Sequence, residues 1–249
     1  MKSPQLMPHV ADVESVSGVS YRIEGDITPA LHCKLDGSRS VYFEHHVLFW
    51  KSSDVAIKLH VGQGAVRRLI TKMPVVLVKA DGVGAIAFSR DAPGQIVPIH
   101  LAPGEGVIVR ENQWLAATDN VAFTPRHQRG LGNILFGGNT FWLDYFEVPA
   151  DADSDGVLWL HGFGNVFASE LQSGESIDVE PGGWIYMTKE TTMKEHPVGL
   201  RAGLMAGHDQ MILNRFSGPG RVGLQSMYYH PQPAGKNAAP SLTQGTDSE

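Results

Sequence analysis

Short apolar runs that alternate with polar residues, broken by glycine and proline, dominate the pattern along this chain. Residues 107–111 (VIVRE) and 177–180 (IDVE) alternate in this way, as pleated strands with one buried face do. Residues 211–226 (MILNRFSGPGRVGLQS) contain two such runs joined by a Ser-Gly-Pro-Gly turn, which is typical of a β-hairpin. No stretch carries a long apolar stripe of helical period. The pattern predicts an all-β protein.

The hairpin pattern recurs, and the recurrence predicts an internal triplication. Leu35, Leu101 and Leu171 each precede a turn, and they are 66 and 70 residues apart. The second offset also aligns Trp114 with Trp184. We therefore expect β units at residues 18–92, 93–163 and 164–231, between a flexible N-terminus (1–17) and a disordered tail (232–249).

Units of about 70 residues made of short strands leave exposed sheet edges. Joining the units edge to edge pairs these edges, but a linear row of three still ends in two open edges. Contact with identical chains would close the row. The pattern thus predicts a cyclic homo-oligomer, with the chain itself as principal partner.

Composition and charge reduce the number of functions that the sequence allows. The formal net charge of −6 disfavours nucleic acid as a partner. The single cysteine, Cys33, excludes an internal disulfide and is expected in the core. No apolar run is long enough to span a bilayer, and the N-terminus lacks the apolar core of a signal peptide. The expected location is cytoplasmic, with peripheral membrane contact as an option.

Several motifs resemble a known family. They are residues 21–37 (YRIEGDITPALHCKLDG), 130–138 (GLGNILFGG), 171–187 (LQSGESIDVEPGGWIYM) and 216–226 (FSGPGRVGLQS). These stretches resemble bacterial relatives of the altered-inheritance-of-mitochondria, or mitochondrial biogenesis, proteins. The resemblance implies three units, each a short double-stranded β-helix like the tryptophan RNA-binding attenuation protein (TRAP-like). It further implies a homotrimer forming a nine-unit ring, and it brings no agreed reaction.

Eleven histidines raise the question of a metal site. In a strand Glu44 and His46 share a face, so they could ligate a metal together with His32 or His60. No His-x-His pair occurs, and ordinary polar histidines are the simpler interpretation. We therefore predict no cofactor.

Three further features have a structural and a functional interpretation. Trp50, Trp114 and Trp184 are expected to pack in or between units rather than to stack on a ligand, although Trp50 is offset by two residues. Residues 151–156 (DADSDG) are expected to be a solvated hairpin tip rather than a calcium loop. Residues 161–164 (HGFG) are expected to form a turn between units rather than an oxyanion hole.

Apolar residues in two glycine-rich connections could form a collar that contacts a membrane or a protein partner. They are Ile134, Leu135, Phe136, Leu204 and Met205. The alternative is that they pack on a neighbouring unit.

No motif supplies a nucleophile, an acid–base pair or a complete metal set. The sequence therefore favours a non-enzymatic, ring-forming scaffold or binding protein. A metal- or small-ligand-binding enzyme or sensor of the double-stranded β-helix type is the alternative.

Overall fold

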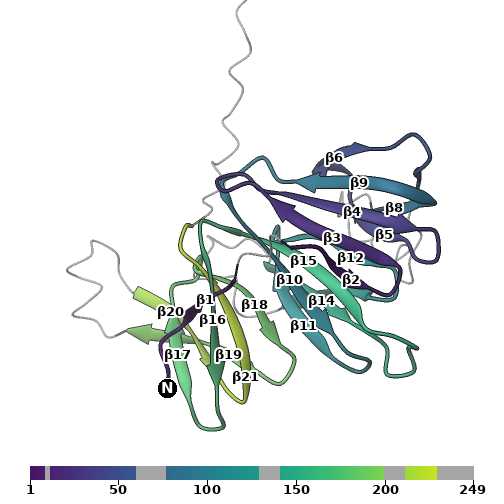
Figure 1. The fold of residues 1–249 in the computed structure, drawn as a ribbon. Coiled ribbons are helices and arrows are strands. Elements are labelled where there is room, and N and C mark those ends of the chain that lie inside the picture. The colour runs from purple at the N-terminus through teal and green to yellow at the C-terminus, as the bar shows by residue number, and fades with distance from the viewer. Residues whose placement is uncertain (9–11, 60–76, 129–140, 199–210, 229–249) are drawn as a thin grey trace, which may run out of the picture.

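The computed structural model describes residues 1–8, 12–59, 77–128, 141–198 and 211–228. The described part is all-β, as the apolar pattern predicts: strands β1 to β21 are accompanied by a single short 3₁₀ segment at His45–Val47. Eighteen of these strands fall into three sets of six, which lie side by side from the upper right to the lower left of Figure 1.

Each set consists of six consecutive strands of the chain. The first set contains β4 (Ala30–Asp36), β5 (Val41–Glu44), β6 (Leu48–Lys51), β7 (Ala56–Leu59), β8 (Leu77–Asp81) and β9 (Val83–Ser89). The second contains β10 (Gly94–Leu101), β11 (Gly106–Arg110), β12 (Trp114–Thr118), β13 (Ala122–Gln128), β14 (Phe141–Glu147) and β15 (Gly156–Phe163). The third contains β16 (Val166–Leu171), β17 (Ser176–Val179), β18 (Trp184–Thr188), β19 (Thr192–Val198), β20 (Met211–Ser217) and β21 (Gly220–Gln225).

Within each set the strands pair in the same order. The first strand pairs with the sixth and the sixth with the third, while the second pairs with the fifth and the fifth with the fourth. The third strand of every set also carries a register shift at the same place, at Leu48/Trp50, Trp114/Ala116 and Trp184/Tyr186. Such a bulge bends and twists a strand locally, so the three sets share a local distortion as well as a strand order.

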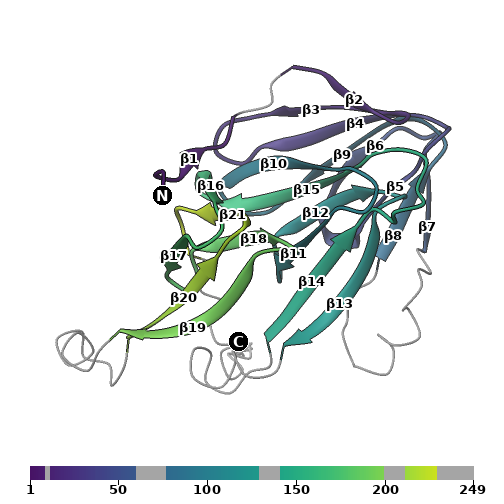
Figure 2. The same ribbon diagram turned by 90° about the horizontal axis from the view of Figure 1, so that it is seen from below.

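Neighbouring sets merge into continuous sheets. The third strand of the second set, β12, pairs with β5 of the first, and β18 of the third set pairs with β11 of the second. Figure 2 shows β10, β15, β12, β5 and β8 as adjacent arrows of one sheet that crosses from the second set into the first.

Residues 1–24 tie the three sets together. The strand β1 (Gln5–Leu6) pairs with β16, whereas β2 (Glu14–Val16) and β3 (Val19–Glu24) form a hairpin beside β4. Between them, the Met7 N–H donates to the Val166 carbonyl at 2.8 Å, and the Gln95 side chain donates to the Met7 carbonyl at 3.0 Å. The structure thus places two short strands in the segment for which the sequence predicts flexibility.

Three buried clusters form the core, and each of them draws side chains from a neighbouring set. Trp114 and Trp184 are fully buried, as expected. Trp50 differs from them, since it is 42 % exposed in the single chain. Its two-residue offset explains the difference, because Leu48 occupies the position equivalent to the buried tryptophans. Cys33 is buried as predicted, and burial raises the pKa of its thiol.

Residues 161–163, for which the sequence predicts a turn, lie instead in β15, and only Gly164 turns away, with φ +70°. The histidine lies directly against β10: a Cβ added at Gly94 would be 2.6 Å from His161 Nε2, so only glycine fits there. Burial, and secondarily the nearby Arg90 charge, lowers the pKa of His161 to about 4.

This buried histidine should make the stability of the protein depend on pH. In the unfolded chain the histidine pKa is about 6.5, so between pH 6.5 and 4 the unfolded state binds the proton more readily. Acidification through this window therefore destabilises the fold, by about 2–3 kcal/mol at pH 4.5 from this residue alone.

The measurement is urea unfolding at pH 7.5 and 4.5 of the wild-type protein and of His161→Gln. Glutamine is a suitable replacement because Gln225 occupies the equivalent place in the third set. Relative to the variant, the wild type should lose stability on acidification. Equal losses in both proteins would show that His161 does not titrate in this window.

Candidate assembly interface

Both internal junctions between sets use the same register of strand pairing. At the first, Ala116, Ala117 and Thr118 oppose Phe43, Tyr42 and Val41; at the second, Tyr186, Met187 and Thr188 oppose Val109, Ile108 and Val107. One further hydrogen bond extends each pairing, from the Asp119 N–H to the Ser40 carbonyl at 3.1 Å and from the Lys189 N–H to the Gly106 carbonyl at 3.2 Å. The two junctions are therefore equivalent residue for residue.

An apolar side chain of the third strand enters the core of the preceding set at each junction. Leu115 is fully buried in the cluster formed mainly by the first set, and Ile185 is fully buried in the cluster formed mainly by the second. Burying a side chain of this size contributes about 1.5–3 kcal/mol, so these insertions stabilise each junction beyond its backbone hydrogen bonds.

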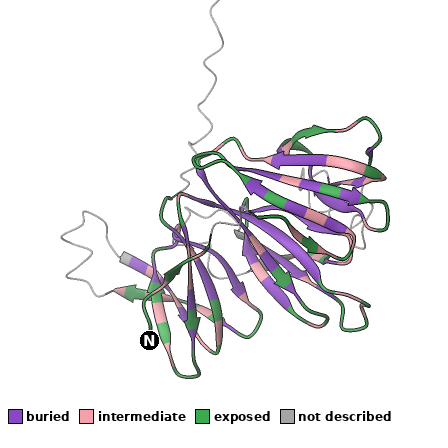
Figure 3. Ribbon diagram, viewed as in Figure 1, coloured by how far each residue is buried: buried purple, intermediate pink, exposed green. Residues whose placement is uncertain are grey.

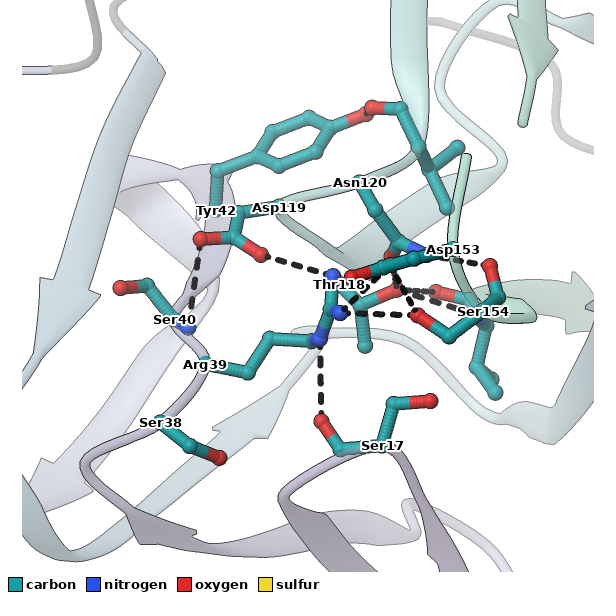
Figure 4. A network of polar contacts seen from close by, with 12 residues as sticks. Ser17, Ser38, Arg39, Ser40, Tyr42, Thr118, Asp119, Asn120, Asp153 and Ser154 are labelled. Atoms are coloured by element: carbon teal, nitrogen blue, oxygen red, sulfur yellow. Dashed lines mark hydrogen bonds and ion pairs between the residues drawn. The ribbon is translucent and has the colours of Figure 1, made fainter. Parts of the chain in front are cut away.

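Arg39 links the first set to the second set at the rim of the first junction (Figure 4). Its guanidinium donates to the Ser17 carbonyl at 3.0 Å, to Ser154 Oγ at 2.9 Å and to Asp119 Oδ1 at 3.4 Å. Lys79 binds the other oxygen of Asp119 at 3.2 Å. Residues 151–156, expected to be a solvated tip, thus also contribute Ser154 to the junction.

At the second junction, long polar side chains form hydrogen bonds with main-chain groups. Arg110 donates to the Gly182 carbonyl at 2.9 Å, and burial lowers the pKa of its guanidinium. The amide of Gln225 donates to the same carbonyl at 2.7 Å and accepts from the Phe163 N–H at 3.0 Å. Gln95 accepts from the Val166 N–H at 2.9 Å. These contacts fix the two sets relative to each other.

Among the described second and third strands of the sets, two lack the neighbour that their counterparts have. The strand β6 is the third strand of the first set and lies at a sheet edge, whereas β12 and β18 are flanked on both sides. The strand β17 is the second strand of the third set and is also an edge, whereas β5 and β11 are flanked on both sides. By contrast, the fourth strands β7, β13 and β19 are edges in every set.

The β6 edge is unusually apolar for an exposed surface. Phe49 is 63 % exposed and Trp50 is 42 % exposed, and Figure 3 shows this strand in green at the upper right. The Trp50 ring lies 5.9 Å from the His32 ring, which leaves the rest of the indole open. Exposed aromatic residues on an open strand edge are typical of a contact surface.

The β17 edge borders a groove with acidic groups. The groove has a volume of about 450 Å³, and its lining includes Ile177, Val179, Leu224 and Tyr228. Asp178 on this edge binds the Arg215 guanidinium through both carboxylate oxygens, each at 2.6 Å. The hydrogen bonds from Arg215 lower the pKa of Asp178, so the carboxylate is ionised at neutral pH.

The predicted metal ligands are only partly brought together. Glu44 and His46 lie 3.3 Å apart, but His32 is paired with Glu24 at 3.3 Å. Burial, followed by the Arg90 and His45 charges, lowers the pKa of His46. His60 lies outside the described residues. Within the described part of the chain, no three His, Cys, Asp or Glu side chains converge on a common point.

The predicted collar residues Ile134, Leu135, Phe136, Leu204 and Met205 also lie outside the described residues. Over the ranges that the structure covers, no helix is long and apolar enough to cross a membrane.

Sequence reasoning missed the residues that define this interface. Arg39 stands in a short turn with no motif around it, and Phe49 reads as an ordinary strand residue. The two-residue offset of Trp50 was the available signal, because it places an indole where the other sets have Ala116 and Tyr186.

Comparison with known proteins supports the family resemblance that the sequence motifs indicate. An uncharacterized protein of Streptococcus pyogenes serotype M6 is 22 % identical over 213 residues, covering 80 % of this chain and 82 % of that protein. A crystal structure of a Streptococcus pyogenes protein shares the fold, with a TM-score of 0.65 at 19 % identity, covering 84 % of this chain and 94 % of that one. The family model described as mitochondrial biogenesis AIM24 matches residues 21–227. The resemblance inferred from the motifs is thereby confirmed, and the chain belongs to the mitochondrial biogenesis AIM24 family.

Proposed function

We propose that this protein is a non-enzymatic scaffold whose three sets are copies of one TRAP-like unit, and that it works as a closed homotrimeric ring. One observation carries the proposal: the junction between a third strand and a second strand is made twice within the chain, and it leaves β6 and β17 as the two halves of a third junction. A contact between different surfaces closes into a ring when the rotation per subunit allows it.

The shared bulge and strand order support equal rotation at every junction, because equivalent backbones place the next set in the same way. The resemblance to TRAP-like rings favours three chains and nine units. Contact with a membrane or a protein partner through Ile134 to Phe136 and through Leu204 and Met205 stays a prediction, which co-sedimentation with lipid vesicles would test.

The alternative is an enzyme or sensor that holds a metal or small ligand. The Glu44–His46 pair is its best candidate, but His32 is engaged by Glu24. A ring explains more of the molecule, since it gives a role to both β6 and β17.

Native mass spectrometry of the untagged protein tests the assembly and the alternative together. The expected species has three times the chain mass of 27.0 kDa, with no additional mass. A monomer at micromolar concentration would contradict the ring. A constant excess mass matching a metal or small molecule would favour the ligand-binding alternative.

Proline substitutions test whether the contact joins β6 to β17. Ser52 donates its N–H to Ala85 of its own set, and the Glu175 carbonyl accepts from Gly218 of its own set. Strand alternation therefore directs the peptide groups of Lys51 and Asp178 to the open sides. Lys51→Pro and Asp178→Pro each remove one outward N–H, so each variant alone should be monomeric.

Mixing the two variants gives the discriminating result. One retains an intact β17 and the other an intact β6, so an equimolar mixture should form a species of two chains and stop there. Asp178→Asn, which keeps the N–H, is the matched control and should still form the trimer. Dimers of Asp178→Pro alone would show that β6 pairs with β6, which would refute a head-to-tail ring.

A further inference from the structure

We infer the register and the side-chain contacts of the junction between copies: β6 of one copy pairs antiparallel with β17 of the next, Lys51 lies opposite Asp178, and Phe49 enters the groove beside β17. The inference rests on the proposed ring and adds to it a specific interface of defined chemistry. It follows from carrying the two internal junctions over to the two strands that lack a neighbour.

The register follows from equivalent positions. The shared bulge aligns Trp50 with Ala116 and Tyr186, and Lys51 with Ala117 and Met187. The spacing from Leu35, Leu101 and Leu171 aligns Asp178 with Tyr42 and Ile108. Ala117 opposes Tyr42, and Met187 opposes Ile108. Lys51 therefore opposes Asp178, and Trp50 opposes Val179.

The charge pair that results from this register supports the register independently. Nothing in the alignment of strands requires opposite charges at these positions, yet a lysine meets an aspartate, which Arg215 of its own chain also binds. Opposite charges directly across an antiparallel pair are stabilising, and like charges are destabilising. Both internal junctions have two uncharged residues in this place.

The equivalence of the sets also predicts where the Phe49 side chain lies, which is in the groove beside β17. Its equivalents Leu115 and Ile185 are fully buried against the preceding set, whereas Phe49 is 63 % exposed because the first set is not preceded by another among the described residues. Ile185 lies close to Gly162, since a Cβ added there would be 3.6 Å from Ile185 Cδ1. The position equivalent to Gly162 in the third set is Ser226.

Ser226 lies between the groove residues Gln225 and Tyr228 in the chain. The groove of about 450 Å³ is thus at the place where the equivalence puts the Phe49 ring. An open groove lined in part by apolar side chains on one edge and an open aromatic side chain on the other are complementary. The occupant that fits this groove is a second copy of the chain.

The charge pair gives this junction a property that the internal ones lack. Surface ion pairs are screened as salt increases, whereas apolar insertions are not. The contact between copies should therefore weaken with salt, while each chain keeps its internal junctions.

Cysteine cross-linking tests the register in the full-length protein. Directly opposed residues have Cα atoms about 4.5–5.5 Å apart, which suits a disulfide. Lys51→Cys combined with Asp178→Cys should give chains linked in covalent trimers on mild oxidation. The native Cys33 is buried and should not react.

The matched control is Lys51→Cys combined with Ser176→Cys, which displaces one cysteine by two residues on the same strand. Diagonal neighbours are about 7–8 Å apart, so this pair should link poorly. A trimer in native mass spectrometry with stronger linking in the control would overturn the register and leave the ring intact. A protein that stays monomeric would refute the ring and the inference together.

The groove contact has a separate test. Phe49→Ser should raise the dissociation constant of the assembly at least about tenfold, since a buried aromatic anchor is removed. Val83→Ser is the control, because Val83 is 62 % exposed and lies at the start of β9, outside the residues of that strand that pair with β6. Equal dissociation constants for Phe49→Ser and the wild type, measured by analytical ultracentrifugation, would overturn the insertion.

Discussion

The organisation of this protein depends on the need of strand edges for hydrogen-bond partners. A strand at the edge of a sheet presents a row of free N–H and C=O groups, which invite another strand to pair. Inside the chain this need is met twice, by β12 on β5 and by β18 on β11. The same pairings set the spacing between sets and the places where side chains cross from one core to the next.

The N-terminal segment meets the same need on another side of the molecule. Two of the three first strands are covered in this way: β3 pairs with β4 and β1 pairs with β16, whereas β10 lies at the edge of its sheet. Met7 adds single hydrogen bonds to Val166 and to the Gln95 side chain between them. Because one segment touches all three sets, it also opposes their separation.

The sequence was sufficient to predict the strands because their signal is local. Alternation and turn residues lie within a few positions of one another, and the landmark leucines repeat at nearly constant spacing. The place of Trp50 was not predictable in this way, since exposure depends on whether a preceding set exists. Arg39 was missed for the same reason: its partners Asp119 and Ser154 are distant in the chain. The Glu44–His46 pair was foreseen because two residues of one short stretch form it.

Long polar side chains at the two junctions bind the backbone. Arg39 and Arg110, the long cations at the two junctions, bind main-chain carbonyls. Gln95 and Gln225 each use both ends of their amides on the backbone. Side chains held in this way fix the geometry of the junctions. The polar groups of the described junctions thus hold neighbouring sets at fixed positions.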